Sequence, residues 1–220
     1  MRALIWKDFM ANRVLWIGGL ALILLPYLLC ALVATISYKG QAHDWWYIFA
    51  NAPGISCMIS FLVVAMVGGV AIAGERPDRS SEFLAYLPPS RAAIITSKAM
   101  VGIGVITVIC LLNMFALYVI EEVKTKEVLE RMKVVYGAIC SSAILIFGFA
   151  WLYSSFLKNP IYSTGLCIAT VLLFWMLFAF VYDTMNWGSN HMVIFTPLAT
   201  VVGIGAFVGG IFSYLHRVEP

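Results

Sequence analysis

The residues of this sequence that could carry out chemistry are few and scattered. It contains no G-x-x-x-x-G-K-[ST] phosphate loop, no G-x-S-x-G nucleophile elbow and no H-E-x-x-H zinc motif. The acidic residues Glu121, Glu122 and Asp183 stand at the ends of apolar runs, without a nucleophile or metal-binding partner nearby in the sequence. The sequence therefore predicts that the chain has no catalytic site and is not an enzyme.

A metal site would have to be built mainly from histidines. Their possible partners are carboxylates and thioethers, ligand types that suit several metals: His43, Asp44, Asp183, Met185, His191 and Met192. Polar residues at a membrane surface are a commoner reason for such a group, so we predict no metal site. The five cysteines, Cys30, Cys57, Cys110, Cys140 and Cys167, have no C-x-x-C spacing and are expected to pack as small apolar side chains.

The composition identifies the elements that must position these residues. Of 220 residues, 62% are hydrophobic and 11% are charged, with a net charge of +3. This balance excludes an ordinary soluble enzyme, a disordered chain and a nucleic-acid-binding protein. Six runs of at least 20 residues contain no Asp, Glu, Lys or Arg: 14–38, 55–74, 99–120, 134–157, 161–182 and 192–215. We predict an all-α integral membrane protein of six spanning helices in one domain, 1–220.

The basic residues predict the orientation of these spans. One side holds nine of them, Arg2, Lys7, Arg13, Arg76, Arg79, Arg91, Lys98, Lys158 and Arg217. The other side holds five, Lys39, Lys124, Lys126, Arg131 and Lys133. Because Lys and Arg concentrate on the cytoplasmic side, both termini are expected there, in a multi-pass protein of a bacterial cytoplasmic membrane. The first apolar run is too long for a removable signal peptide.

Residues 1–13, before the first span, have the pattern of a helix that lies in the cytoplasmic membrane interface. Ile5, Trp6, Phe9 and Met10 share one face. Lys7, Asp8 and Asn12 lie away from that face, and Trp6 is expected at headgroup depth. The alternative is that these residues form only a charged, irregular beginning of the first span.

The segment 74–91, between the second and third spans, predicts a short amphipathic helix at the cytoplasmic surface. Asp78 can cap this helix and Pro88-Pro89 ends it. Its apolar face is formed by Phe83, Leu84 and Leu87, while Arg79 can pair with Glu82 and Ser90 can cap the third span. The face could be covered by the membrane, by a groove on a soluble partner, or by the chain's own bundle.

The apolar runs offer no source of energy for transport. Glu75, like the acids named above, lies at the end of a run, and Asn113 is the one amide in the middle of a run. Carriers driven by ions place ionisable groups inside the membrane. The chain is therefore expected either to conduct passively or to be driven by a partner. Gly205 and Gly209 form a G-x-x-x-G, which allows close helix packing within the chain or between two copies.

The segment 74–98 resembles the signature of the ABC type-2 transporter permeases. It contains Gly-Glu-Arg from Gly74, Ser-Ser-Glu-Phe-Leu from Ser80, Leu-Pro-Pro-Ser-Arg from Leu87, and Ser97-Lys98. The opening Leu4-Ile-Trp-Lys-Asp-Phe is also similar to the start of that family. Glu75, Arg79, Glu82, Phe83 and Arg91 match motif positions. Pro77-Asp78 departs from the family's usual Glu/Arg-Gly.

The resemblance implies a half-transporter. Two permeases, identical or different, would pair in the lipid bilayer, and two soluble ATPase subunits carrying ATP and Mg would bind beneath them. The helix Asp78–Leu87 would be the coupling helix, with Leu84, Tyr86 and Leu87 added from its apolar pattern. Export is the expected direction, and the apolar spans weakly favour hydrophobic or amphipathic cargo. The alternatives are a passive channel or secondary carrier, and a membrane-embedded enzyme or structural assembly subunit.

Overall fold

The structure is a computed structural model that describes residues 2–37, 42–74, 90–120, 126–185 and 191–216. In these ranges the chain is helical and contains no strand. The helices are α1 (Arg2–Ala11), α2 (Arg13–Ser37), α3 (Ala42–Ala73), α5 (Arg91–Ile120), α6 (Lys126–Phe156), α7 (Pro160–Met185) and α8 (His191–His216). Six of them, α2 to α8, are long and apolar enough to cross a membrane. The predicted six-span helical fold is confirmed.

Three of these helices begin earlier than the apolar runs predict. α3 begins at Ala42, so the backbone of the aromatic stretch His43–Tyr47, which lies before the second apolar run, is helical. α6 begins at Lys126, so this helix also covers the charged residues 126–133 before the fourth apolar run. α5 begins at Arg91, because Ser90 caps it through a 3.2 Å bond from the Ala93 N–H to the Ser90 Oγ. A charged residue ends an apolar run, but it does not end a helix.

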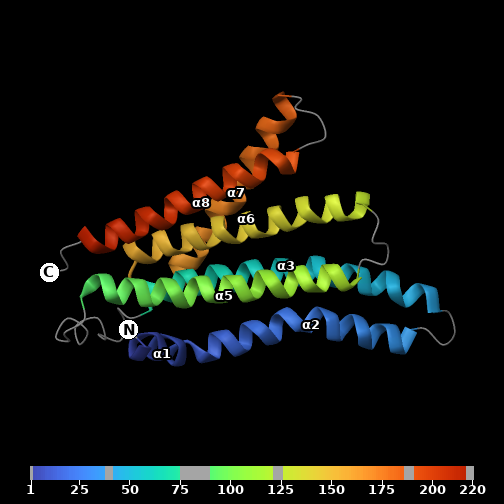
Figure 1. Cartoon of the computed structure of the whole chain (residues 1–220), viewed down its shortest axis with the longest axis horizontal. Coiled ribbons are helices and arrows are strands. Elements are labelled where there is room, and N and C mark those ends of the chain that lie inside the picture. The colour runs from blue at the N-terminus through green and yellow to red at the C-terminus, as the bar shows by residue number, and fades with distance from the viewer. Residues whose placement is uncertain (1, 38–41, 75–89, 121–125, 186–190, 217–220) are drawn as a thin grey trace.

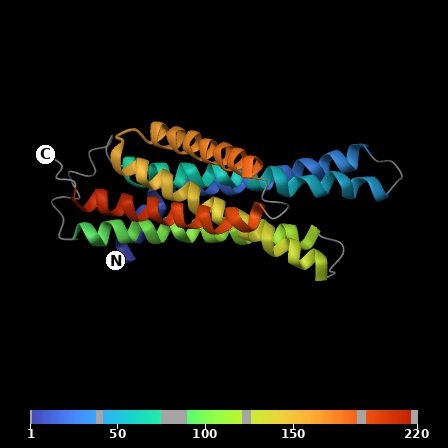
Figure 2. The same cartoon turned by 90° about the horizontal axis from the view of Figure 1, so that it is seen from above.

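The six long helices run roughly along one axis (Figure 1). The two ends of the described chain lie at the same end of this bundle as the end of α3 and the start of α5. We call the segment 75–89, which joins α3 to α5 in the sequence, the elbow, and this end of the bundle the elbow end. At the opposite end the pair α2 and α3 diverges from the pair α5 and α6 (Figure 2). The bundle is therefore held together most closely towards its middle and its elbow end.

The core is built around α3 and α6, which are the most buried spans. α3 contacts α2, α5, α6 and α7, and α6 has its most extensive interface with α8. Trp151, Leu145 and Phe195 are completely buried there. The outward faces of α2, α7 and α8 are covered with exposed Leu, Ile, Val and Phe, which suits contact with lipid tails.

Glycines allow α6 and α8 to approach closely. A Cβ on Gly148 would clash with the backbone oxygen of Gly203, and a Cβ on Gly203 would lie 2.7 Å from the backbone of Leu145. A Cβ on Gly210 would meet Trp151 Cδ1 at 2.6 Å. The helix axes can be this close because these positions have no side chain.

Candidate functional site

The helix α1 lies at the elbow end with one side against the bundle and the other exposed. Trp6, Phe9 and Met10 are exposed, with Trp6 at 64%. Asp8 is 7% exposed and faces α5. This arrangement has the polarity we predicted for an interfacial helix, with the apolar face outward. It differs from our expectation in one respect, because the carboxylate opposite that face is buried in protein instead of lying in water.

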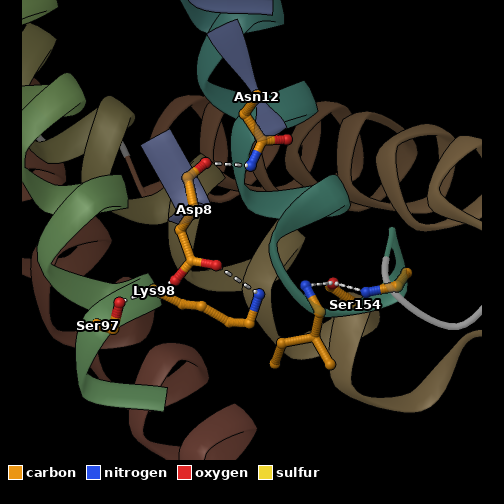
Figure 3. Close-up of polar contacts among 7 residues, drawn as sticks. Asp8, Asn12, Ser97, Lys98 and Ser154 are labelled. Carbon is orange, nitrogen blue, oxygen red and sulfur yellow. Dashed lines mark hydrogen bonds and ion pairs between the residues drawn. The ribbon is translucent and has the colours of Figure 1, made fainter. Parts of the chain in front are cut away.

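Asp8 is the centre of a buried polar cluster (Figure 3). The Ser97 hydroxyl donates to Asp8 Oδ2 over 2.8 Å, and Lys98 Nζ lies 3.5 Å from Asp8 Oδ1. Lys98 is also 7% exposed. Placing all charges outside the spans was therefore wrong for Lys98, which lies two turns inside α5. A long helix can bury a lysine there because α1 supplies the opposite charge.

Contacts within α1 and with α2 fix the backbone around this cluster. The Asn12 side chain donates to the Asp8 carbonyl oxygen over 3.0 Å. The Trp16 indole N–H donates to the carbonyl oxygen of Phe9 over 3.2 Å, and the two rings stack at 6.4 Å. A cavity of about 20 Å³ borders Asp8, Asn12 and Lys98. A cavity of this size can hold about one water molecule, which could satisfy remaining hydrogen-bonding groups of the pair.

The last turn of α3, on the other side of the elbow, is held by α6. The backbone N–H groups of Ile72 and Ala73 donate to the Ser154 hydroxyl oxygen over 2.9 Å and 2.8 Å. Figure 3 shows this second contact beside the Asp8 cluster. Gly68 packs so tightly that a Cβ there would lie 2.6 Å from the Ala150 Cβ. The end of α3 is therefore fixed to the core of the bundle.

The residues that the sequence singled out between these two anchored helix ends lie outside the described residues. These are Glu75, Asp78, Arg79, Glu82, Phe83, Leu84, Tyr86 and Leu87, and the predicted coupling helix lies there with them. Arg91 is described, and it is exposed as the first residue of α5. The predicted cap of the third span by Ser90 is confirmed.

The interior of the bundle contains a short polar chain across α5, α3 and α2. The Asn113 side-chain nitrogen donates to Ser60 Oγ over 2.8 Å, Ser60 donates to the Ser56 carbonyl oxygen, and Ser56 Oγ donates to the Ile23 carbonyl oxygen over 2.9 Å. The Asn113 Oδ1 atom is buried with no hydrogen-bond partner in the described part of the chain. These contacts join three of the spanning helices through uncharged groups.

An apolar cavity separates α5 from α6 and α8. Its volume is about 430 Å³. Ile103, Ile106 and Cys110 line it from α5, Phe147 from α6, and Phe207 from α8. Its surface is almost entirely carbon, so it cannot bind a charged solute. It does leave α5 incompletely packed on this side.

The predicted glycine pair lies elsewhere than the close helix contact. A Cβ on Gly205 would have no neighbour within 4 Å, and one on Gly209 would meet Leu152 Cδ1 at 3.6 Å. Gly203 and Gly210, which lie on the side of α8 that faces α6, make the close contact instead. Packing of Gly205 and Gly209 against a second permease stays a prediction.

The absence of a metal centre stays a prediction. In the described ranges, no three His, Cys, Asp or Glu residues gather closely enough to hold a metal ion. Asp183 is exposed, and His216 stacks on Phe212 at 3.9 Å. The side chains of His43 and His191 lie outside the described side chains.

Sequence reasoning missed the Asp8 cluster and Ser154. Asp8 and Ser97 are separated by 89 positions, and no spacing rule joins two residues so far apart. One signal was present, because Asp8 and Lys98 each belong to a stretch that resembled a family motif. That coincidence could have indicated that the two stretches meet.

Comparison with protein families gave a match over most of the chain. A sequence profile described as "ABC-2 family transporter protein" matches residues 6–175. The matched range runs from α1 into α7 and includes Asp8, the elbow and Lys98. Comparison with curated proteins gave no match, and comparison with solved structures gave none either.

Proposed function

Since the chain belongs to the ABC-2 transporter family, and is thus a membrane-spanning transporter subunit, we propose that separate soluble ATPase subunits drive it. The observation that carries this proposal is the arrangement at the elbow end. Two helix ends on either side of residues 75–89 are anchored by buried polar contacts, Ile72 and Ala73 to Ser154, and Ser97 to Asp8. A force applied between two anchored helices is transmitted into the bundle, because packed helices move as rigid elements.

The distribution of charge supports an external source of energy. In the described parts of the six spans, charged side chains are confined to the ends or, for Lys98, to the first two turns of α5. Transport coupled to protons or sodium ions uses ionisable groups near the middle of the membrane. The proposed source is ATP, bound with Mg by the partner subunit and not by this chain.

The proposed function also includes an orientation in the membrane, a second permease and a class of cargo. The elbow end and both termini would face the cytoplasm, where a soluble ATPase is available. A second permease, identical or different, would complete the translocation path within the lipid bilayer, and Gly205, whose Cβ would have no neighbour within 4 Å, would suit that contact together with Gly209 one turn further along α8. Export of a hydrophobic or amphipathic cargo is the proposed direction.

Co-purification with a soluble cassette ATPase tests this proposal. The wild-type chain in detergent is expected to capture the ATPase, and Phe83→Asp is expected to abolish capture because it places a charge on the predicted apolar docking face. Phe83→Leu is the matched control and should retain capture. Size-exclusion profiles establish that all three chains are equally folded.

Two results would contradict the proposal. One is unchanged ATPase capture by Phe83→Asp, which would remove the elbow from the contact. The other is accumulation of a fluorescent amphipathic dye against its gradient in liposomes that contain the purified chain alone. Simple downhill flux of the dye in such liposomes would instead favour a passive channel.

A further inference from the structure

The helix α1 connects two spans that make little direct contact with each other. α2 packs against α3, and α5 packs against α3 and α6, whereas α1 contacts both α2 and α5. The link to α2 consists of the chain itself and the Trp16–Phe9 contact. The link to α5 includes the bonds of the Asp8 carboxylate to Ser97 and Lys98.

An apolar contact would not hold α1 in one orientation. Its exposed side, with Trp6, Phe9 and Met10, favours the membrane interface but leaves the helix free to slide and rotate there. A buried ion pair adds little net stability over a well-packed apolar pair, because both charges lose their hydration. The ion pair does fix the orientation of α1 relative to α5, because a carboxylate with bonds to both of its oxygens has one allowed position.

We propose that Asp8 is a positioning residue that couples α2 to α5 through α1. When the first turns of α5 are displaced, the Asp8 contacts to Ser97 and Lys98 carry α1 along, and α1 carries the start of α2. This inference rests on the proposed function, because it assumes that a partner displaces α5 at its elbow end. It concerns described residues alone and does not depend on what the elbow itself looks like.

The packing of α5 leaves room for such a displacement. The apolar cavity of about 430 Å³ lies on the side of α5 that faces α6 and α8. The end of α3 is fixed to α6 by Ser154 and by the tight Gly68–Ala150 contact. α5 also meets α6 closely at Gly102, where a Cβ would lie 2.6 Å from Phe147 Cζ, but the atom it meets belongs to a side chain that borders the cavity. Of the two helices that flank the elbow, α5 is thus the one with space on one side, and α1 is the element that ties it to α2.

The first test measures the coupling without any ATPase. Leu15 of α2 and Val101 of α5 border the same small cavity as Asp8. Leu15→Cys and Val101→Cys, in a chain whose five native cysteines are replaced by Ala, can be bridged by a short bifunctional thiol reagent in membranes. Asp8→Asn is expected to lower the bridging rate by more than about tenfold, because it removes the carboxylate that fixes α1 against Ser97 and Lys98 of α5.

Two further variants separate positioning from simple misfolding. Asp8→Asn combined with Lys98→Met removes the buried charge, so the folded yield should return to that of the wild-type chain while bridging stays low. Lys158→Met, an exposed basic residue after α6, is the control and should leave bridging unchanged. Equal bridging in the Asp8→Asn, double-variant and wild-type chains would overturn the proposal.

The second test uses the complex with its ATPase. Asp8→Asn is expected to capture the ATPase normally but to lose the rise in ATP hydrolysis that the permease produces. Bridging Leu15→Cys to Val101→Cys in that chain should restore the rise, because the covalent link replaces the ion pair. A bridged chain that remains unresponsive would overturn the inference. If the wild-type chain captures no ATPase, the proposed function fails, and the bridging rates alone decide whether Asp8 couples α2 to α5.

Discussion

Adding one methyl group at Gly203 should separate α6 from α8. A Cβ at this position would lie 2.7 Å from the Cα and N atoms of Leu145, which are backbone atoms and cannot rotate away. Ordinary van der Waals contact begins at 3.4 Å, so α8 would have to shift by at least about 0.7 Å. The α6–α8 interface is the most extensive in the described structure, so the shift affects many contacts at once.

The expected cost of Gly203→Ala is about 1–3 kcal/mol in the free energy of unfolding. Overpacking a well-packed core typically costs about 1–3 kcal/mol. A gap of about 0.5–1 Å at each displaced contact also removes roughly a quarter to a half of the van der Waals attraction there. Replacing glycine by alanine also favours the helix by up to about 1 kcal/mol. Gly205→Ala gains the same helix preference without any clash, because nothing lies within 4 Å of its Cβ. The difference between the two variants therefore isolates the packing cost.

Thermal unfolding of the detergent-purified chain, followed by a dye that reacts with newly exposed thiols, measures this difference. Cys167 and Cys110 are buried in the folded chain and provide the signal. Gly203→Ala should unfold about 2–12 °C below Gly205→Ala for a chain of this length. Equal unfolding temperatures, or a lower one for Gly205→Ala, would show that α8 packs on α6 through a different face.

Substitutions at two further positions, Ser154 and Asn113, test polar contacts through thermal unfolding and folded yield. Ser154→Ala removes the acceptor of the Ile72 and Ala73 N–H groups and should cost about 1–3 kcal/mol. Ser141→Ala is the control on the same helix, because the Ser141 hydroxyl bonds to the Ala138 carbonyl oxygen within α6, and it should cost much less. Equal losses would contradict the role of Ser154. Asn113→Leu should cost less than about 1 kcal/mol in the free energy of unfolding, because losing the bond to Ser60 is offset by removing the buried Oδ1 atom that has no partner in the described part of the chain. Asn113→Asp buries a charge at the same position and should sharply reduce the folded yield. Indifference to Asn113→Asp would mean that water reaches this site.

The six spans could be predicted because their signal is local. Each apolar run is long enough to cross a bilayer, and lipid leaves a chain of this kind little choice but to form helices. The cap at Ser90 was predictable for the same reason, since it depends on one residue and its neighbours. The helix ends were not, because α3, α5 and α6 continue past the charged residues that ended the runs.

The contacts between helices could not be predicted because the sequence does not give the rotation of each helix about its axis. Gly205 and Gly209 were predicted to allow close packing from their spacing, but the burial of the α8 face against α6 selects Gly203 and Gly210. The burial of Asp8 could not be predicted for the same reason. An acid near the N-terminus is expected in water, and its burial depends on how α1 lies against α5.

Taken with the packing, these contacts divide the described bundle by how firmly each helix is held. α3, α6 and α8 are joined through glycines and buried aromatic rings, so they are expected to remain a fixed unit. α5 packs directly on α3, but on the side of α6 and α8 it meets this unit across an apolar cavity, and its link through α1 to α2 includes the Asp8–Lys98 ion pair and the Ser97 hydrogen bond. Close-packed interfaces resist small shifts, whereas an unfilled one allows a second arrangement at little cost. Any conformational change that opens a path through this chain should therefore begin with α5, and filling the cavity by Cys110→Phe should hinder that change without reducing the stability of the α6–α8 interface.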